Sequence, residues 1–142
     1  MQGRAFAQVL CHADIHAANI LIDESGEIVL VDWDGPRLAP RERDLLFVVG
    51  SRIARRVEPA GEVAFFTGYG PVAIDPAALI YYRYERVIED MGEIGKRVLL
   101  DPWPSEAARA AEAALMMRFF APDGILTSIE TVDLHHLPLS AS

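Results

Sequence analysis

Two short stretches of this sequence concentrate the polar side chains that could do chemistry, residues 12–19 and residues 32–35. Asp14 is a candidate general base. The amide oxygen of Asn19 and the carboxylate of Asp32 are hard oxygen ligands of the kind that suits Mg²⁺, which binds one or two protein carboxylates and completes its shell with water and phosphate. A base that precedes an Asn ligand, with an Asp ligand on the following hairpin, is the arrangement of kinase-type phosphoryl transfer.

Three short strands are predicted to position these side chains. Residues 8–11, 19–23 and 27–32 are rich in Ile, Val and Leu, and β-branched residues favour strands. The polar loop Asp23-Glu24-Ser25-Gly26 between the last two strands predicts a hairpin. The first polar stretch would then connect two strands, and the second would follow the end of the hairpin. Pairing of the strands would bring both stretches to the same end of the hairpin, on loops of the kind that carry catalytic residues.

From residue 41 to residue 134 the apolar pattern is helical. Residues 41–49, preceded by Pro36 and Pro40, are predicted as one helix, and residues 59–70 as a second. Asp75-Pro76 is a helix start, with Asp as N-cap and Pro at the first helical position.

The helix that starts at Pro76 is predicted to run for about 25 residues and to end before Asp101-Pro102. Its apolar side chains recur at helical spacing and form one stripe: Ile80, Tyr84, Val87, Met91, Ile94 and Val98. Charged residues lie mostly off the stripe, Arg83 among them. Ser105 opens an Ala-rich helix to about residue 120, and Pro122-Asp123 begins a final helix that ends near residue 134. The predicted fold class is therefore α+β and mostly α, a small hairpin followed by about four or five helices.

The motif His12-x-Asp14-x-His16-x-x-Asn19, followed by Val31-Asp32-Trp33-Asp34, resembles the catalytic and metal-binding motifs of the aminoglycoside phosphotransferase family. That family has a protein-kinase-like fold. The resemblance implies that Asp14 is the catalytic aspartate, and that Asn19 and Asp32 hold Mg²⁺ against the phosphates of ATP. It also implies a set of residues that support the catalytic loop: His12, His16, Asp34 and Asp44. The sequence Tyr81–Arg86 is similar, more loosely, to a helix of the spectinomycin branch.

Considered individually, His16 and Asp34 each allow two interpretations. His16 is either a ligand or a loop histidine that satisfies a backbone carbonyl, and Asp34 is either a supporting carboxylate or a turn residue before Gly35-Pro36. The resemblance implies an ATP- and Mg²⁺-dependent phosphotransferase of a small hydroxylated, cationic acceptor such as an aminoglycoside, and hence antibiotic resistance.

The resemblance covers the C-terminal lobe of the family fold, and residues 1–142 are expected to form a single domain of that kind. Only eleven residues precede His12, and the one lysine of the chain is Lys96. The N-terminal lobe, which in kinase-like enzymes carries a nucleotide-covering loop and a phosphate-binding lysine, is therefore expected to be absent.

Composition narrows the class of protein further. The 142 residues carry 13 basic and 21 acidic side chains, a net charge of −8, and 51% are hydrophobic. A generally basic nucleic-acid binder is excluded, because phosphate contacts need clustered Lys and Arg. The single cysteine, Cys11, fits a reducing cytoplasm. No apolar run reaches the ~18 residues that a membrane helix needs, so no membrane contact is expected.

Two alternatives stay open at this stage. One is a metal-dependent hydrolase that uses His12, His16, Asp14 and Asp32 as ligands, since imidazole and carboxylate suit Zn²⁺, Mn²⁺ or Fe²⁺. The other is a catalytically inactive fragment or paralogue of the family that self-associates as a homodimer, because a lobe without its partner lobe exposes apolar surface.

Overall fold

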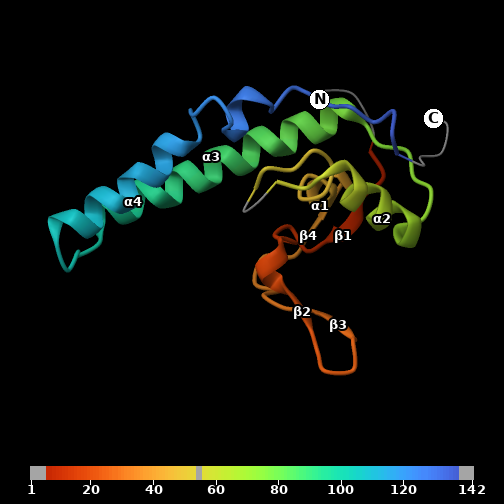
Figure 1. Cartoon of the computed structure of the whole chain (residues 1–142), viewed down its shortest axis with the longest axis horizontal. Helices are drawn as coiled ribbons and strands as arrows, with labels where there is room; N and C mark the ends of the chain where they lie inside the picture. Colours follow the sequence, from red (N-terminus) through yellow and green to blue (C-terminus); the bar gives the residue numbers. More distant parts are fainter. Residues whose placement is uncertain (1–5, 54–55, 138–142) are drawn as a thin grey trace. The chain divides into compact units, whose positions relative to one another are not determined.

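The computed structural model describes residues 6–53 and 56–137 (Figure 1). The chain forms two compact units. Among the described residues, the first comprises 6–53, 56–82 and 132–137, and the second comprises Arg83–Thr131. The described residues form four α-helices and two small sheets, as the α+β, mostly α prediction requires. None of their helices is long and apolar enough to cross a membrane.

The predicted hairpin is confirmed. Strands β2 (Ile20–Ile22) and β3 (Ile28–Leu30) pair antiparallel, with Ile20 opposite Leu30. Their loop closes on Asp23, whose Oδ1 accepts hydrogen bonds from the Ser25 and Glu27 amides at 2.8 and 2.9 Å. Gly26 has a φ of 86°, a conformation that costs an L-residue free energy but suits glycine. The hairpin projects from the first unit (Figure 1).

A second pair of strands lies beside the first polar stretch. Strand β1 (Val9–Cys11), which was predicted, pairs antiparallel with β4 (Arg37–Ala39), which was not. Pro36 and Pro40 flank β4, and from the sequence alone they indicate only the start of the helix that follows. Because Cys11 lies opposite Arg37, the pairing brings the start of β4 beside the first polar stretch.

The predicted helix over residues 41–49 is too long. Helix α1 spans only Glu42–Leu45, and tighter turns follow, in which Phe47 N donates to Asp44 O and Val48 N to Leu45 O. Gly50, with a φ of 54°, ends the segment. Its side chains nevertheless form the centre of the first unit, because Leu45, Leu46 and Val49 are at most 2% exposed.

The core of the first unit packs these residues against three other segments. Helix α2 (Pro59–Tyr69) supplies Phe66, the start of helix α3 (Pro76–Leu100) supplies Leu79 and Tyr82, and the C-terminal segment supplies Leu137. Both helices begin close to where the sequence predicted. Asp75 is the N-cap of α3, since its Oδ1 accepts from the Ala77 and Ala78 amides at 2.8 and 3.1 Å.

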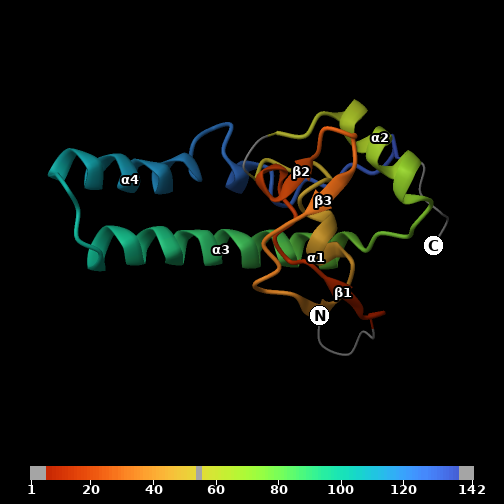
Figure 2. The same cartoon turned by 90° about the horizontal axis from the view of Figure 1, so that it is seen from below.

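The second unit is mainly a helical pair. Helix α4 (Glu106–Arg118) runs back beside the second half of α3 (Figure 2), and Arg97 Nη2 lies 2.7 Å from Glu112 Oε1 between them. As predicted, Ser105 caps α4, with its hydroxyl accepting from the Ala108 amide at 3.1 Å.

One helix prediction is wrong. The segment after Pro122 forms only a short 3₁₀ turn, η2 (Ile125–Thr127), and is otherwise irregular. The reason lies in α3, where Arg83 was expected off the apolar stripe but is 3% exposed. Its Nη1 donates to the carbonyls of Ile129 and Thr131 at 3.1 and 2.9 Å. In the predicted helix the carbonyl of Ile129 would accept from an amide one turn later; here it accepts from the buried guanidinium instead.

The predicted stripe on α3 is correct in part. Val87 and Ile94 are buried, whereas Tyr84 is 37% exposed and its hydroxyl donates to Glu130 at 2.7 Å. Near the start of the helix, the buried face consists instead of Ala78, Leu79, Tyr82 and Arg83.

Candidate functional site

Asp44 holds the start of the first polar stretch in place. Its Oδ2 accepts from the His12 amide at 2.9 Å and its Oδ1 from the Ala13 amide at 2.7 Å. Ala13 has a φ of 71°, a left-handed conformation that costs a non-glycine residue about 1–2 kcal/mol. Because one carboxylate accepts both consecutive amides, it stabilises this strained turn, which sends the chain from β1 into the loop.

His12 fastens the loop to the end of the hairpin. Its Nε2 donates to the carbonyl of Val31 at 2.9 Å, and its Nδ1 accepts from the amide of Asp14 at 3.3 Å. A carbonyl can only accept, so these two bonds fix a neutral imidazole with the proton on Nε2. The ring is 3% exposed and packs against Trp33 at 4.5 Å between centroids. One buried ring thus connects Asp14 to the residue that precedes Asp32.

The imidazole of His16 lies beside the carboxylate of Asp14. His16 Nδ1 accepts from the Ala18 amide at 3.2 Å, which caps the short turn η1 (Ala17–Asn19). Its Nε2 therefore carries the proton and lies 3.6 Å from Asp14 Oδ2, whose side chain is 35% exposed. His16 thus bonds to the loop backbone through an amide and not through the carbonyl that one of the two interpretations required, and its Nε2 faces Asp14.

Asn19 lies between Asp14 and the end of the hairpin. Its Nδ2 donates to the Asp14 carbonyl at 2.9 Å and lies 3.5 Å from Asp14 Oδ2. Its own carbonyl accepts from the Val31 amide at 3.0 Å, which extends the β2–β3 pairing by one step. The side chain is buried, and no donor among the described residues reaches its Oδ1. That oxygen is therefore available to a ligand.

Asp32 follows directly after Val31, and its backbone is also left-handed, with a φ of 65°. Its carboxylate is exposed and has no hydrogen bond or ion pair within residues 6–53 and 56–137. Asp34 is likewise exposed, in the turn that leads to Gly35-Pro36. The predicted convergence is thus present in the backbone: the hydrogen bonds of Val31 to Asn19 and His12 place both polar stretches at one end of the hairpin.

This arrangement does not suit the alternative four-ligand metal site. Both ring nitrogens of His12 are committed to backbone groups, so His12 cannot also bind a metal without losing two buried hydrogen bonds. Among the described residues, no three His, Cys, Asp or Glu side chains are grouped to hold a metal ion. A site that draws on the amide oxygen of Asn19 is compatible with both facts.

Two features of the site were not predicted. Trp33 stands over the ring of His12, and its Nε1 donates to the Leu30 carbonyl at 3.0 Å. The sequence signal for this contact is the position of Trp33 directly after Asp32, a candidate metal ligand. The other is the thiol of Cys11, whose pKa is raised to about 11 by burial and, next in size, by the charge of Asp44.

Comparison with known proteins agrees with this geometry. Residues 2–82 match the model of the APH family, described as a phosphotransferase enzyme family. The chain is similar to the crystal structure of spectinomycin phosphotransferase APH(9)-Ia in complex with ADP and spectinomycin, with 34% identity and a TM-score of 0.69. It is similarly close to the AMP-bound complex of that enzyme, with 35% identity and a TM-score of 0.70. Comparison with curated proteins gave no match.

These similarities extend over most of this chain but only part of the relatives. The match covers 88% and 87% of this chain, and 38% and 37% of the two solved chains. The family match spans more than half of the sequence and includes every residue of the two polar stretches as well as Asp44. The chain therefore belongs to the APH phosphotransferase family.

Proposed function

We propose that this chain carries the catalytic loop and the metal-binding residues of an ATP- and Mg²⁺-dependent phosphotransferase. The observation that supports this most is a set of part-buried hydrogen bonds that ties Asp14 and Asn19 to Val31, the residue directly before Asp32. The loop and the hairpin end carry different roles in kinase-type transfer, and here His12 joins them.

In this proposal Asp14 orients the acceptor hydroxyl and accepts its proton. Its carboxylate is partly exposed, so an acceptor can reach it, while its backbone is fixed on both sides. The Nε2 proton of His16 is directed toward the same carboxylate and would help to fix its orientation. Positioning of this kind supplies much of the rate enhancement in phosphoryl transfer.

Mg²⁺ fits the oxygen atoms that the site offers. Asn19 presents an amide oxygen that no described donor uses, and Asp32 presents an exposed carboxylate. One carboxylate, one amide oxygen, water and phosphate make up the usual shell of a nucleotide-bound Mg²⁺ ion. When bound, the ion would neutralise charge on the phosphates of ATP; Asn19 and Asp32 would hold it, and Asp34 and Asp44 would support the two loops.

The acceptor is proposed to be a small hydroxylated cation. The similar enzyme was solved with spectinomycin and ADP, and a net charge of −8 favours a cationic over an anionic substrate. An aminocyclitol or aminoglycoside combines the hydroxyl group and the positive charge that this requires.

The chain spans 38% of the solved enzyme, so the sharpest test places it in that context. Residues 6–137 would replace the matched segment of spectinomycin phosphotransferase, and phosphate transfer from ATP to spectinomycin would be measured. In a graft that transfers phosphate, Asp14→Asn should lower kcat by about a hundredfold or more. Asp23→Asn, in the distant hairpin loop, is the matched control and should leave kcat unchanged. A folded graft in which Asp14→Asn keeps full activity would contradict the proposal.

One observation favours the second candidate, a self-associating member of the family. The β2–β3 hairpin exposes apolar side chains on both faces: Leu21, Ile22, Ile28 and Val29 are 43–69% exposed. Such surface favours association with a second copy. Light scattering tests this: Ile22→Lys with Ile28→Lys should shift a dimeric mass to a monomeric one, and a monomeric mass for the unchanged chain would rule the candidate out.

A further inference from the structure

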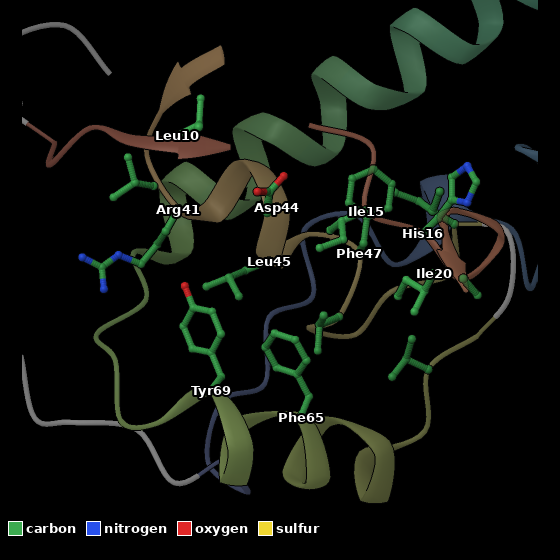
Figure 3. Close-up of a pocket in the computed structure, with 15 residues that line it drawn as sticks. Leu10, Ile15, His16, Ile20, Arg41, Asp44, Leu45, Phe47, Phe65 and Tyr69 are labelled. Atoms are coloured by element: carbon green, nitrogen blue, oxygen red, sulfur yellow. The ribbon is translucent and has the colours of Figure 1, made fainter. Parts of the chain in front are cut away.

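A cavity of about 540 Å³ lies in the first unit, beside Ile15 and His16 of the catalytic loop, residues 12–19 (Figure 3). Its walls come from β1, the catalytic loop, α1 with the turns after it, and α2. Most of the lining is apolar or aromatic, with Leu45, Phe47 and Phe65 along its length. Cavities of roughly 300–1,000 Å³ with such walls are typical of small-molecule sites.

The polar groups of the cavity are few, and all except Asp44 lie at its two ends. Figure 3 shows Arg41 and the hydroxyl of Tyr69 at one end, and His16 and Ile20 at the other. Asp44 also lines the cavity, but its two carboxylate oxygens accept the amides of His12 and Ala13. The cavity therefore contains no carboxylate that lacks a partner of its own.

The guanidinium of Arg41 carries a positive charge that no described residue neutralises. It is half-buried, and no hydrogen bond or ion pair of its guanidinium occurs within residues 6–53 and 56–137. A guanidinium at the end of an apolar cavity favours an anionic group with two oxygen atoms, such as a carboxylate or a sulfonate. The Tyr69 hydroxyl lies at the same end of the cavity in Figure 3 and is a second hydrogen-bond donor for an anionic oxygen.

We propose that this cavity binds a small elongated anion with an apolar body, of the aryl or alkyl carboxylate or sulfonate class. The anionic group lies at Arg41 and Tyr69, and the apolar body extends along Leu45, Phe65 and Phe47 toward the catalytic loop. The net charge of −8 repels anions in general. Binding of such a ligand therefore depends on the local guanidinium and is specific to this cavity.

Two fluorescent probes that share one ring system separate the two parts of the proposal. Anilinonaphthalene sulfonate carries the anionic group, and N-phenylnaphthylamine lacks it. The unchanged full chain should bind one equivalent of the sulfonate, and Arg41→Gln should weaken that binding about tenfold, the value of one charge-assisted hydrogen bond. The same substitution should leave the affinity for the neutral probe within about twofold.

The control for lost positive charge is Arg109→Gln, because Arg109 lies on α4 in an exposed pair with Glu106. It should bind both probes as the unchanged chain does. Amide spectra identify the site, since the sulfonate should shift Ile15, His16 and Ala17 and leave the hairpin loop unchanged. Equal sulfonate affinity in Arg41→Gln, shifts confined to the exposed β2–β3 strands, or no saturable binding would each overturn the proposal.

Discussion

The two units of this chain are stabilised by different kinds of interaction. In the first unit, buried side chains bond to backbone groups far away in sequence: Asp44 to the His12 and Ala13 amides, and Glu42 Oε1 to the Asp75 amide at 2.9 Å. In the second unit most such bonds are local, as in the Ser105 cap, with Arg83 as the main exception.

This difference has an energetic consequence. Removing one partner of a buried long-range bond leaves the other partner without a hydrogen bond, which costs about 1–3 kcal/mol for each group. Removing a local surface bond returns its partner to water and costs much less. Substitutions in the first unit should therefore have large effects, and comparable substitutions in the second unit small ones.

The largest effect is expected in the core of the first unit. Phe66 is 1% exposed, so Phe66→Ala should lower the free energy of unfolding by about 3–5 kcal/mol through lost burial and the resulting cavity. Leu115→Ala on α4 is the comparison in the second unit, where Leu115 is 40% exposed, and should cost under about 1 kcal/mol. Urea denaturation measures both, and equal losses would contradict the difference between the units.

Asp44→Ala should follow, with a loss of about 3 kcal/mol, because the amides of His12 and Ala13 would both lack an acceptor. Asp44→Asn retains one oxygen and should lose about half as much. Hydrogen exchange of these two amides gives a direct measurement. If they stay as protected in Asp44→Ala as in the unchanged chain, Asp44 does not hold the loop.

The thiol of Cys11 provides a pH-dependent measurement of the same region. Its pKa of about 11, against 9.0 for an ordinary thiol, leaves about a hundredfold less thiolate at pH 8, so alkylation should be correspondingly slow. The unfolded chain loses this proton above pH 9 while the folded chain keeps it, so stability should fall between pH 9 and 11. Asp44→Asn should move the alkylation midpoint to lower pH, and an unchanged midpoint would show that burial alone raises the pKa.

The smallest effect concerns a local cap in the second unit. Ser105→Ala removes the acceptor for the Ala108 amide and should cost about 1 kcal/mol. Ser105→Asp retains the cap and should restore the stability. Thermal unfolding distinguishes these variants, and a loss as large as that of Asp44→Ala would remove the contrast between the two units.

The sequence predicted best what local chemistry determines. The hairpin loop at Asp23–Gly26, the Asp75 and Ser105 caps and the ends of α3 all follow from short-range rules, and the structure confirms them. The two polar stretches were also predicted to meet, because one hairpin carries both.

What the sequence could not predict depends on distant partners. Strand β4 forms only because β1 lies beside it. Where a helix was predicted after Pro122, an irregular segment presents two carbonyls to the buried Arg83, and the partners of buried Glu62 are Gly50 and His136. Neither a residue type nor its spacing shows which remote group will neutralise a buried charge.

The most direct test of the proposed site is a titration of the ¹⁵N-labelled chain with Mn²⁺, a paramagnetic ion that prefers the same oxygen ligands as Mg²⁺. Line broadening should begin at the amides of Asp14, Asn19 and Asp32. Asp32→Asn should abolish it, and Asp23→Asn should not. Broadening centred on the hairpin loop, or spread evenly over the acidic surface, would contradict the proposed site.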